Sequence, residues 1–160
     1  MYGKSLAPNA TGTLRLGWGV VSGYEEKGKK IPSHTTFDSM LSRAAGQREK
    51  APFELSKKFR AAQFNFDLKT PLNFVSTADG CPGSSGSPMF TQDLKLVGVM
   101  FDGNEQEVPS IYSYIPPETG GRSISVDVSA IMVALEHIYA AKWLREEILA
   151  AAEEAEAVAK

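Results

Sequence analysis

The segment "PLNFVSTADGCPGSSGSPMFTQDLKLVGVMFDG", residues 71–103, decides the fold. Its apolar stretches at 71–78 and 95–101 predict strands, because short β-branched and aromatic runs bounded by turn residues are typical of strands. "SPMF" (87–90) and the second run are joined by "TQDL", which predicts a hairpin. The turn before the hairpin is unusual, since residues 81–90 hold three serines, two glycines and two prolines.

The rest of the chain predicts a mainly β fold that ends in a helix. "TGTLRLGWGVVSGY" (11–24) alternates apolar and polar residues as a strand does, with a bulge at Gly17 or Gly19. Two short segments, "TTFDSMLSRAAG" and "APFELSKKFRAAQ", have the caps and spacing of short amphipathic helices. "RSISVDV" predicts a last strand, and apolar residues then recur at helical spacing as far as Ile148.

These elements define a fold class and a division of the chain. We expect one antiparallel β-barrel half with two short helices and a long C-terminal helix. Residues 1–126 form the barrel half that carries the serine turn. Residues 127–160 form the C-terminal helix, which packs on the barrel and has a solvated Ala/Glu-rich end.

Composition excludes several function classes. The chain has 160 residues, 42% of them hydrophobic and 22% charged, as in a globular domain. A net charge of −2 gives no reason to expect nucleic-acid binding, and no apolar run is long enough for a membrane span. Cys81 is the only cysteine, and His34 and His137 are far apart, so we expect no disulfide, no metal site and no cofactor. "NAT" at Asn9 matches a glycosylation sequon, a triplet that is common by chance.

The serine turn has the pattern that nucleophilic catalysis requires. A serine hydroxyl needs a base to take its proton, and the tetrahedral intermediate needs N–H donors for its oxyanion. We therefore predict Ser85 as the nucleophile, with the backbone amides of Gly83 and Ser85 as the oxyanion hole. The pattern differs from the α/β-hydrolase elbow, because Ser87 replaces the final glycine and a strand follows. A Gly/Ser turn without chemistry and an anion-binding nest are the alternatives.

The nucleophile region "CPGSSGSP…LVGVMFDGN" resembles that of trypsin-like double-β-barrel serine peptidases. More closely, the chain resembles the C-terminal part of the bacterial dipeptidyl-peptidase 7 and 11 family. "TLRLGWGVVSGY", "TTFDSML", "GSSGSPMF…LKLVGVMFDGN" and "RSISVDVSAIMVALEHIYAAKWLREEI" carry this resemblance in the expected order, over residues 11–149. It implies a trypsin-like barrel half that removes dipeptides from free peptide N-termini.

The resemblance also assigns site residues. It makes Ser85 the nucleophile and Gly83 with Ser85 the oxyanion hole, although Ser84 stands where family members commonly have Asn. Gly103 falls where the family sets its preference for the residue before the scissile bond. An Arg there pairs with acidic substrates, whereas Gly implies an uncharged, roomier pocket with a hydrophobic preference. Asp102 matches a family residue near the substrate's free α-amino group; an ordinary strand-end turn is the alternative.

The catalytic triad lacks its histidine and carboxylate in this chain. His34 lies near a predicted helix start and His137 within the long predicted helix, where packed or surface roles are expected. The resemblance implies that both missing residues come from an N-terminal barrel half. The chain is then a fragment of a longer peptidase, a subunit that pairs with a separate barrel, or a remnant that binds without catalysis. Without that half, an exposed apolar patch and self-association are expected.

Two function classes therefore stay open. The first is the C-terminal half of a serine dipeptidyl-peptidase, which acts on a peptide with a free N-terminus. The second is a non-catalytic β module that binds a peptide or partner chain at a strand edge. The resemblance implies a periplasmic or cell-surface location, although the first residues have no apolar core of the signal-peptide kind.

Overall fold

The structure is a computed structural model that describes residues 14, 16–80, 83–113 and 115–158. The predictions for Asn9 and Cys81 lie outside these residues. The chain divides into two compact units. The first comprises residues 1–35 and 71–128, and the second comprises residues 36–70 and 129–160.

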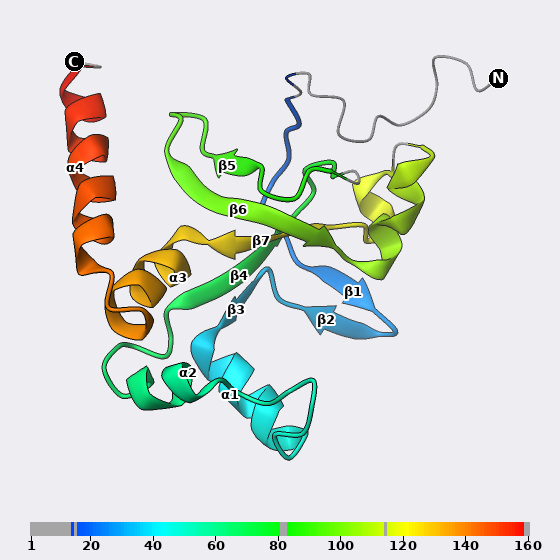
Figure 1. Ribbon diagram of the computed structural model, residues 1–160. Helices are drawn as coiled ribbons and strands as arrows, with labels where there is room; N and C mark the ends of the chain where they lie inside the picture. The colour runs from blue at the N-terminus through cyan, green and yellow to red at the C-terminus, as the bar shows by residue number, and fades with distance from the viewer. Residues whose placement is uncertain (1–13, 15, 81–82, 114, 159–160) are drawn as a thin grey trace. The chain divides into compact units, whose positions relative to one another are not determined.

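The first unit is built on a five-stranded sheet in the order β3-β4-β7-β6-β5 (Figure 1). Its strands are β3 (His34–Thr36), β4 (Pro71–Ser76), β5 (Pro88–Phe90), β6 (Leu96–Gly103) and β7 (Ser123–Asp127). The pairs β4–β7, β6–β7 and β5–β6 are antiparallel. The mainly β fold class is therefore confirmed, and the predicted strand, turn and hairpin follow one another at 71–103.

Close packing at the sheet centre fixes the positions of β4, β6 and β7. Phe74 of β4 and Met100 of β6 are both buried. At Gly98 an added Cβ would lie 2.5 Å from the Phe74 ring and 2.5 Å from the Val126 carbonyl oxygen. Only glycine fits at this position, because real Cβ atoms do not approach other heavy atoms so closely.

The strand predicted over residues 11–24 is only partly formed in the part that is described. Val21 forms a single antiparallel bridge with Ser76, and the side chains of Leu14, Leu16 and Trp18 are about nine-tenths exposed. Pairing with β4 is limited to the residues next to this bridge, where Ser22 N–H donates to the Val75 carbonyl and Thr77 N–H donates to the Val20 carbonyl. A hairpin of β1 (Tyr24–Glu26) and β2 (Lys29–Ile31) follows, and it begins at Tyr24, the last residue of the predicted strand.

The second unit contains the two short helices predicted from the sequence, α1 (Phe37–Gly46) and α2 (Lys57–Ala62). Thr36 caps α1 and Ser56 caps α2, each accepting a hydrogen bond from a backbone N–H in the first turn. The rings of Phe37, Phe59 and Phe66 pack together with centroids 5.0–6.2 Å apart. These aromatic contacts form the core of the unit.

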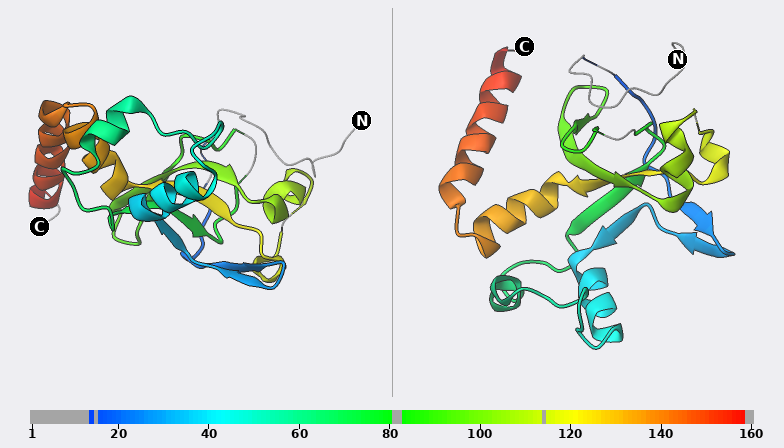
Figure 2. Two further views of the ribbon diagram at one scale, coloured as in Figure 1. Left: turned by 90° about the horizontal axis from the view of Figure 1, so that it is seen from below. Right: turned by 45° about the vertical axis from the view of Figure 1, so that its right-hand side comes forward.

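The prediction of a single long C-terminal helix is wrong, because the helix is interrupted. The chain forms α3 (Val128–Val133), a π-helical turn η3 (Ala134–Ile138) and α4 (Lys142–Val158). Ala140 has φ 54°, a left-handed conformation that ends the helical ladder. Figure 2 shows α4 turning sharply away from the direction of α3 and η3. The apolar spacing continues across this break, which is why the periodicity did not reveal it.

The observed division differs in one respect from the predicted domains 1–126 and 127–160. The helical segment Thr36–Thr70 belongs with the C-terminal helices, not with the sheet. The predicted solvated end is exposed over residues 149–155, yet it remains helical as far as Val158. The packing of the C-terminal helix on the barrel stays a prediction. Among the described residues, no helix is both long and apolar enough to cross a membrane.

Candidate active site

Backbone hydrogen bonds join the C-terminal end of the serine turn to strand β6. Gly86 N–H donates to the Met100 carbonyl over 2.7 Å, and Met100 N–H donates to the Ser87 carbonyl over 2.9 Å. Ser87 N–H donates to the Ser84 carbonyl and closes the turn. Gly83 has φ 94° and Gly86 has φ 92°, backbone conformations that L side chains rarely adopt. The glycines of the motif therefore shape the turn around Ser85.

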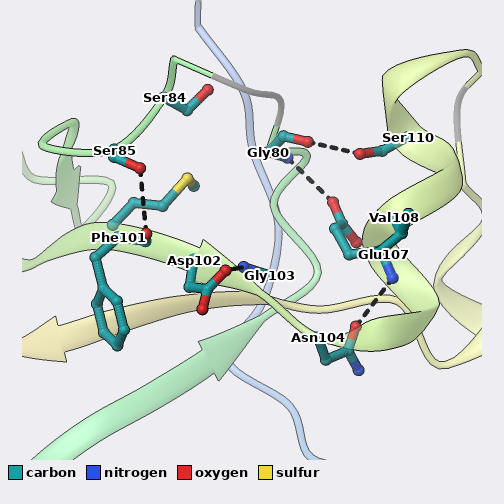
Figure 3. A pocket seen from close by; sticks show the side chains of 11 residues that line it. Gly80, Ser84, Ser85, Phe101, Asp102, Gly103, Asn104, Glu107, Val108 and Ser110 are labelled. Carbon is teal, nitrogen blue, oxygen red and sulfur yellow. Dashed lines mark hydrogen bonds between the residues drawn. The ribbon is translucent and has the colours of Figure 1, made fainter.

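The Ser85 side chain is exposed at the edge of a pocket. Its hydroxyl donates a hydrogen bond to the Phe101 carbonyl oxygen on β6, over 3.1 Å (Figure 3). Within the described part of the chain, the Ser85 N–H makes no hydrogen bond and takes no part in sheet pairing. A hydroxyl and an adjacent free amide are what a nucleophile and one oxyanion donor require. The catalytic roles of Ser85 and Gly83 stay predictions.

The pocket beside Ser85 has a volume of about 200 Å³. It is lined by Gly80, Ser84, Ser85, Met100, Phe101, Asp102, Gly103, Asn104, Glu107, Val108 and Ser110. The structure thus brings together three of the residues predicted from the sequence, namely Ser85, Asp102 and Gly103. The Asp102 carboxylate is exposed and accepts a hydrogen bond from Gly103 N–H. This contact matches the strand-end turn that was the alternative for Asp102, and it leaves the carboxylate accessible.

The sequence predicted that Gly103 leaves a roomier pocket, but part of the space beside Gly103 is filled by another side chain. A Cβ at this position would lie 2.9 Å from Cγ and 3.0 Å from Cβ of Glu107. The Glu107 side chain therefore occupies the space next to Gly103. Glu107 lies on the 3₁₀-helix η1 (Glu105–Ile111), and its side chain is buried.

Glu107 and Ser110 hold the chain just before the serine turn. Gly80 N–H donates to Glu107 Oε1 over 3.2 Å, and the Ser110 hydroxyl donates to the Gly80 carbonyl over 2.9 Å (Figure 3). Burial raises the pKa of the Glu107 carboxyl, and Asp79 adds to this. The Gly80 N–H and the charge of Arg122 oppose the rise in pKa.

Glu107 was not predicted from the sequence, although the residues before it carry the signal of a helix start. Asn104 caps η1 through its side-chain oxygen, which accepts from Glu107 N–H over 3.1 Å. The spacing N-x-x-E is that of a helix start with an acidic third residue. It could have predicted η1, but the direction of the Glu107 side chain depends on Gly80, Gly103 and Gly121, which only the folded structure brings together.

Neither histidine lies in the pocket. His34 is on β3, where its ring lies 6.0 Å from that of Phe74 and its Nδ1 is 3.1 Å from the Ser33 hydroxyl. His137 is on η3 in the second unit, stacked on Phe66. No histidine is among the described residues that line the pocket. Across the residues that the structure describes, no cluster of three His, Cys, Asp or Glu could hold a metal ion.

An antiparallel sheet with an exposed serine on a glycine turn, followed by a hairpin, is the fold of the trypsin-like barrel half that the sequence predicted. The chain belongs to the Peptidase S46 family, whose model matches residues 1–150. It is 27% identical over 143 residues to "Dipeptidyl-peptidase 7" of Porphyromonas gingivalis, which covers 85% of this chain and 20% of that protein. It is 30% identical over 151 residues to "Asp/Glu-specific dipeptidyl-peptidase" of Capnocytophaga gingivalis, covering 88% and 20%.

Solved structures show the same fold. The structure of Porphyromonas endodontalis DPP11 in complex with the dipeptide Arg-Asp matches with a TM-score of 0.74 and 24% identity. The match covers 92% of this chain and 22% of that chain. The chain therefore spans about a fifth of the length of the relatives it matches.

Proposed function

We propose that this chain is the C-terminal part of a serine dipeptidyl-peptidase. In this proposal the Ser85 hydroxyl gives its proton to the histidine of the partner half and attacks the peptide carbonyl two residues from a free N-terminus. The scissile C–N bond breaks, the rest of the peptide leaves as an amine protonated by that histidine, and the dipeptide stays as an acyl-enzyme until water releases it. The observation that carries the proposal is the exposed Ser85 hydroxyl at the pocket edge, on a turn whose Ser85 amide is free to bind an oxyanion.

The triad histidine and aspartate are supplied by a partner half in this proposal. Support comes from the described pocket lining, which holds no histidine, and from the fifth of the relatives' length that the chain spans. The exposed side chains of Trp18, Phe90 and Phe101 in the first unit fit a surface that another barrel covers. The isolated chain is then inactive, because an unassisted serine hydroxyl is a poor nucleophile.

The proposed preference is for an uncharged, hydrophobic residue before the scissile bond. Support comes from Gly103, which stands where the family resemblance associates an arginine with acidic specificity, and from Met100 and Val108 in the pocket lining. No lysine or arginine is among the described residues that line the pocket. Among the relatives, the name "Asp/Glu-specific dipeptidyl-peptidase" states an acidic preference, and the name "Dipeptidyl-peptidase 7" states none. In this proposal Asp102 binds the substrate's α-ammonium group through its exposed carboxylate.

Co-expression with the N-terminal part of the Porphyromonas endodontalis relative tests the proposal. The pair should release aminomethylcoumarin from dipeptidyl substrates, whereas the isolated chain should not. Substrates with a blocked N-terminus should not react. Ser85→Ala should abolish release, and Ser87→Ala, on the same turn, serves as the matched control. A pair whose turnover is unaffected by Ser85→Ala contradicts the proposal. A chain that binds peptide equally well with and without Ser85 favours the non-catalytic module.

A further inference from the structure

Two glycines, Gly103 and Gly121, make room for the carboxyl side chain of Glu107 beside the pocket, and a third, Gly80, donates to it. Gly80 donates its N–H to Oε1, and a Cβ at Gly103 would lie 2.9 Å from Cγ. At Gly121 a Cβ would lie 2.8 Å from Oε2. A larger residue at Gly103 or Gly121 would force the carboxyl group to move. The chain is therefore built to place an acidic side chain here.

The charges around this carboxyl group leave the pocket acidic. Asp102 and Glu107 line it, and Asp79 lies close enough to raise the Glu107 pKa. The nearby cation is Arg122, which is buried and whose guanidinium donates to backbone carbonyl oxygens. These are the carbonyls of Ser22, Gly23, Pro117 and Gly121. Arg122 is thus engaged in holding the backbone and is not directed at a pocket ligand.

We infer that Glu107 sets the order among charged side chains before the scissile bond, so that lysine or arginine is accepted more readily than aspartate or glutamate. This rests on the proposed function, whose hydrophobic preference it keeps and to which it adds a rule for charged residues. A cationic side chain entering next to Glu107 gains a charge-assisted hydrogen bond. An acidic one meets a like charge with no cation in the described lining to offset it.

The preference depends on the protonation of Glu107. Burial and Asp79 raise its pKa, whereas the Gly80 N–H and Arg122 lower it. The charged form increases as pH rises, so the preference for a cationic side chain increases with it. Glu107→Gln keeps an oxygen for the Gly80 N–H and removes only the charge. It therefore separates the charge from the structural role of Glu107.

The test uses the co-expressed pair and dipeptidyl substrates with Lys, Met or Glu before the coumarin group. The ratio of kcat/KM for Lys to that for Met should fall about tenfold in Glu107→Gln, and the Glu-to-Met ratio should rise. Glu105→Gln, an exposed carboxylate on the same helix, should leave both ratios unchanged. Ratios that are the same in the Glu107→Gln variant as in the parent chain overturn the inference.

A second measurement separates failure of this inference from failure of the proposed function. If the pair cleaves no substrate, the proposed function fails, and nuclear magnetic resonance titration of the isolated chain decides the inference. The amide signals of Gly80 and Gly103 should shift at lower concentrations of Ala-Lys than of Ala-Glu. The difference should disappear in Glu107→Gln. Equal responses to both dipeptides, or none, contradict the inference.

Discussion

The Ser85 hydroxyl donates its hydrogen bond to the carbonyl oxygen of Phe101, 3.1 Å away on β6. The proton that a catalytic base must remove is therefore held by a backbone acceptor. A carbonyl oxygen is too weak a base to activate serine, so an imidazole must take its place before attack. In this account, Phe101 holds the hydroxyl in the pocket, and activation waits for a histidine from a partner half.

Gly98→Ala should destabilise the sheet by about 2–3 kcal/mol, since its Cβ would overlap the Phe74 ring and the Val126 carbonyl. Urea unfolding followed by circular dichroism measures the change. Gly17→Ala is the matched control, because its Cβ would meet backbone atoms of Asp79 at 3.5 and 4.0 Å, which are ordinary contact distances. Equal stability of the two variants would show that Gly98 is not packed as described.

Asn104→Ala should cost about 2–3 kcal/mol of unfolding free energy, because buried polar partners lose their hydrogen bonds. The Asn104 oxygen accepts from the N–H groups of Glu107 and Arg122, and its amide donates to the Gly120 carbonyl. Asn104→Asp keeps the acceptor oxygen, so its free energy of unfolding should fall less than that of Asn104→Ala. Chemical denaturation of both variants checks the order, and a loss that is larger for Asp than for Ala contradicts it.

Phe37→Ala should destabilise the helical unit by about 3–5 kcal/mol, because it leaves a cavity among buried rings. Phe37 is 3% exposed and packs against Phe59 and Phe66. Phe64→Ala removes a ring that is 84% exposed and should change stability by less than about 0.5 kcal/mol. Thermal unfolding distinguishes the two, and a similar shift in Tm for both would refute the assignment of the core.

The folded protein should lose stability as pH rises through the titration of Glu107. Its pKa is raised above the ordinary 4.5, so the folded state keeps this proton to a higher pH than the unfolded state does. The folded state binds more protons in the window above 4.5, and its stability falls as pH increases across that window.

Glu107→Gln removes this contribution. The Tm of the parent chain relative to that of the variant should therefore decrease as pH rises above 4.5. A difference that stays constant with pH would mean that the pKa of Glu107 is not raised in the folded protein.

The sequence predicted the part of the fold in which local signals and tertiary structure agree. The strand at 71–76, the hairpin of β5 and β6 and the strand β7 all have apolar runs bounded by turn residues, and each finds a neighbour in the sheet. The alternating segment 11–24 has the same local signal, but the pairs of its described residues are limited to Val21 with Ser76 and Tyr24 with Ile31. The break at Ala140 was not visible because alanine carries no sequence mark of a left-handed conformation.

The serine turn of the candidate site could be predicted from the sequence, whereas the position of Glu107 in the pocket lining could not. The glycines at 83 and 86 indicate a turn from their own conformational freedom. Glu107 enters the pocket through contacts with Gly80, Gly103 and Gly121, which are 27, 4 and 14 residues away in the sequence. Such a site depends on long-range packing, which periodicity and spacing do not encode.

The central claim is that Ser85 is the nucleophile once a partner half supplies the base. Fluorophosphonate labelling of the co-expressed pair, followed by peptide mass spectrometry, tests it most directly. The account predicts a stoichiometric adduct on Ser85 in the pair and none on the isolated chain. An adduct on another residue of an active pair, or dipeptide release that persists without any adduct on Ser85, would contradict it.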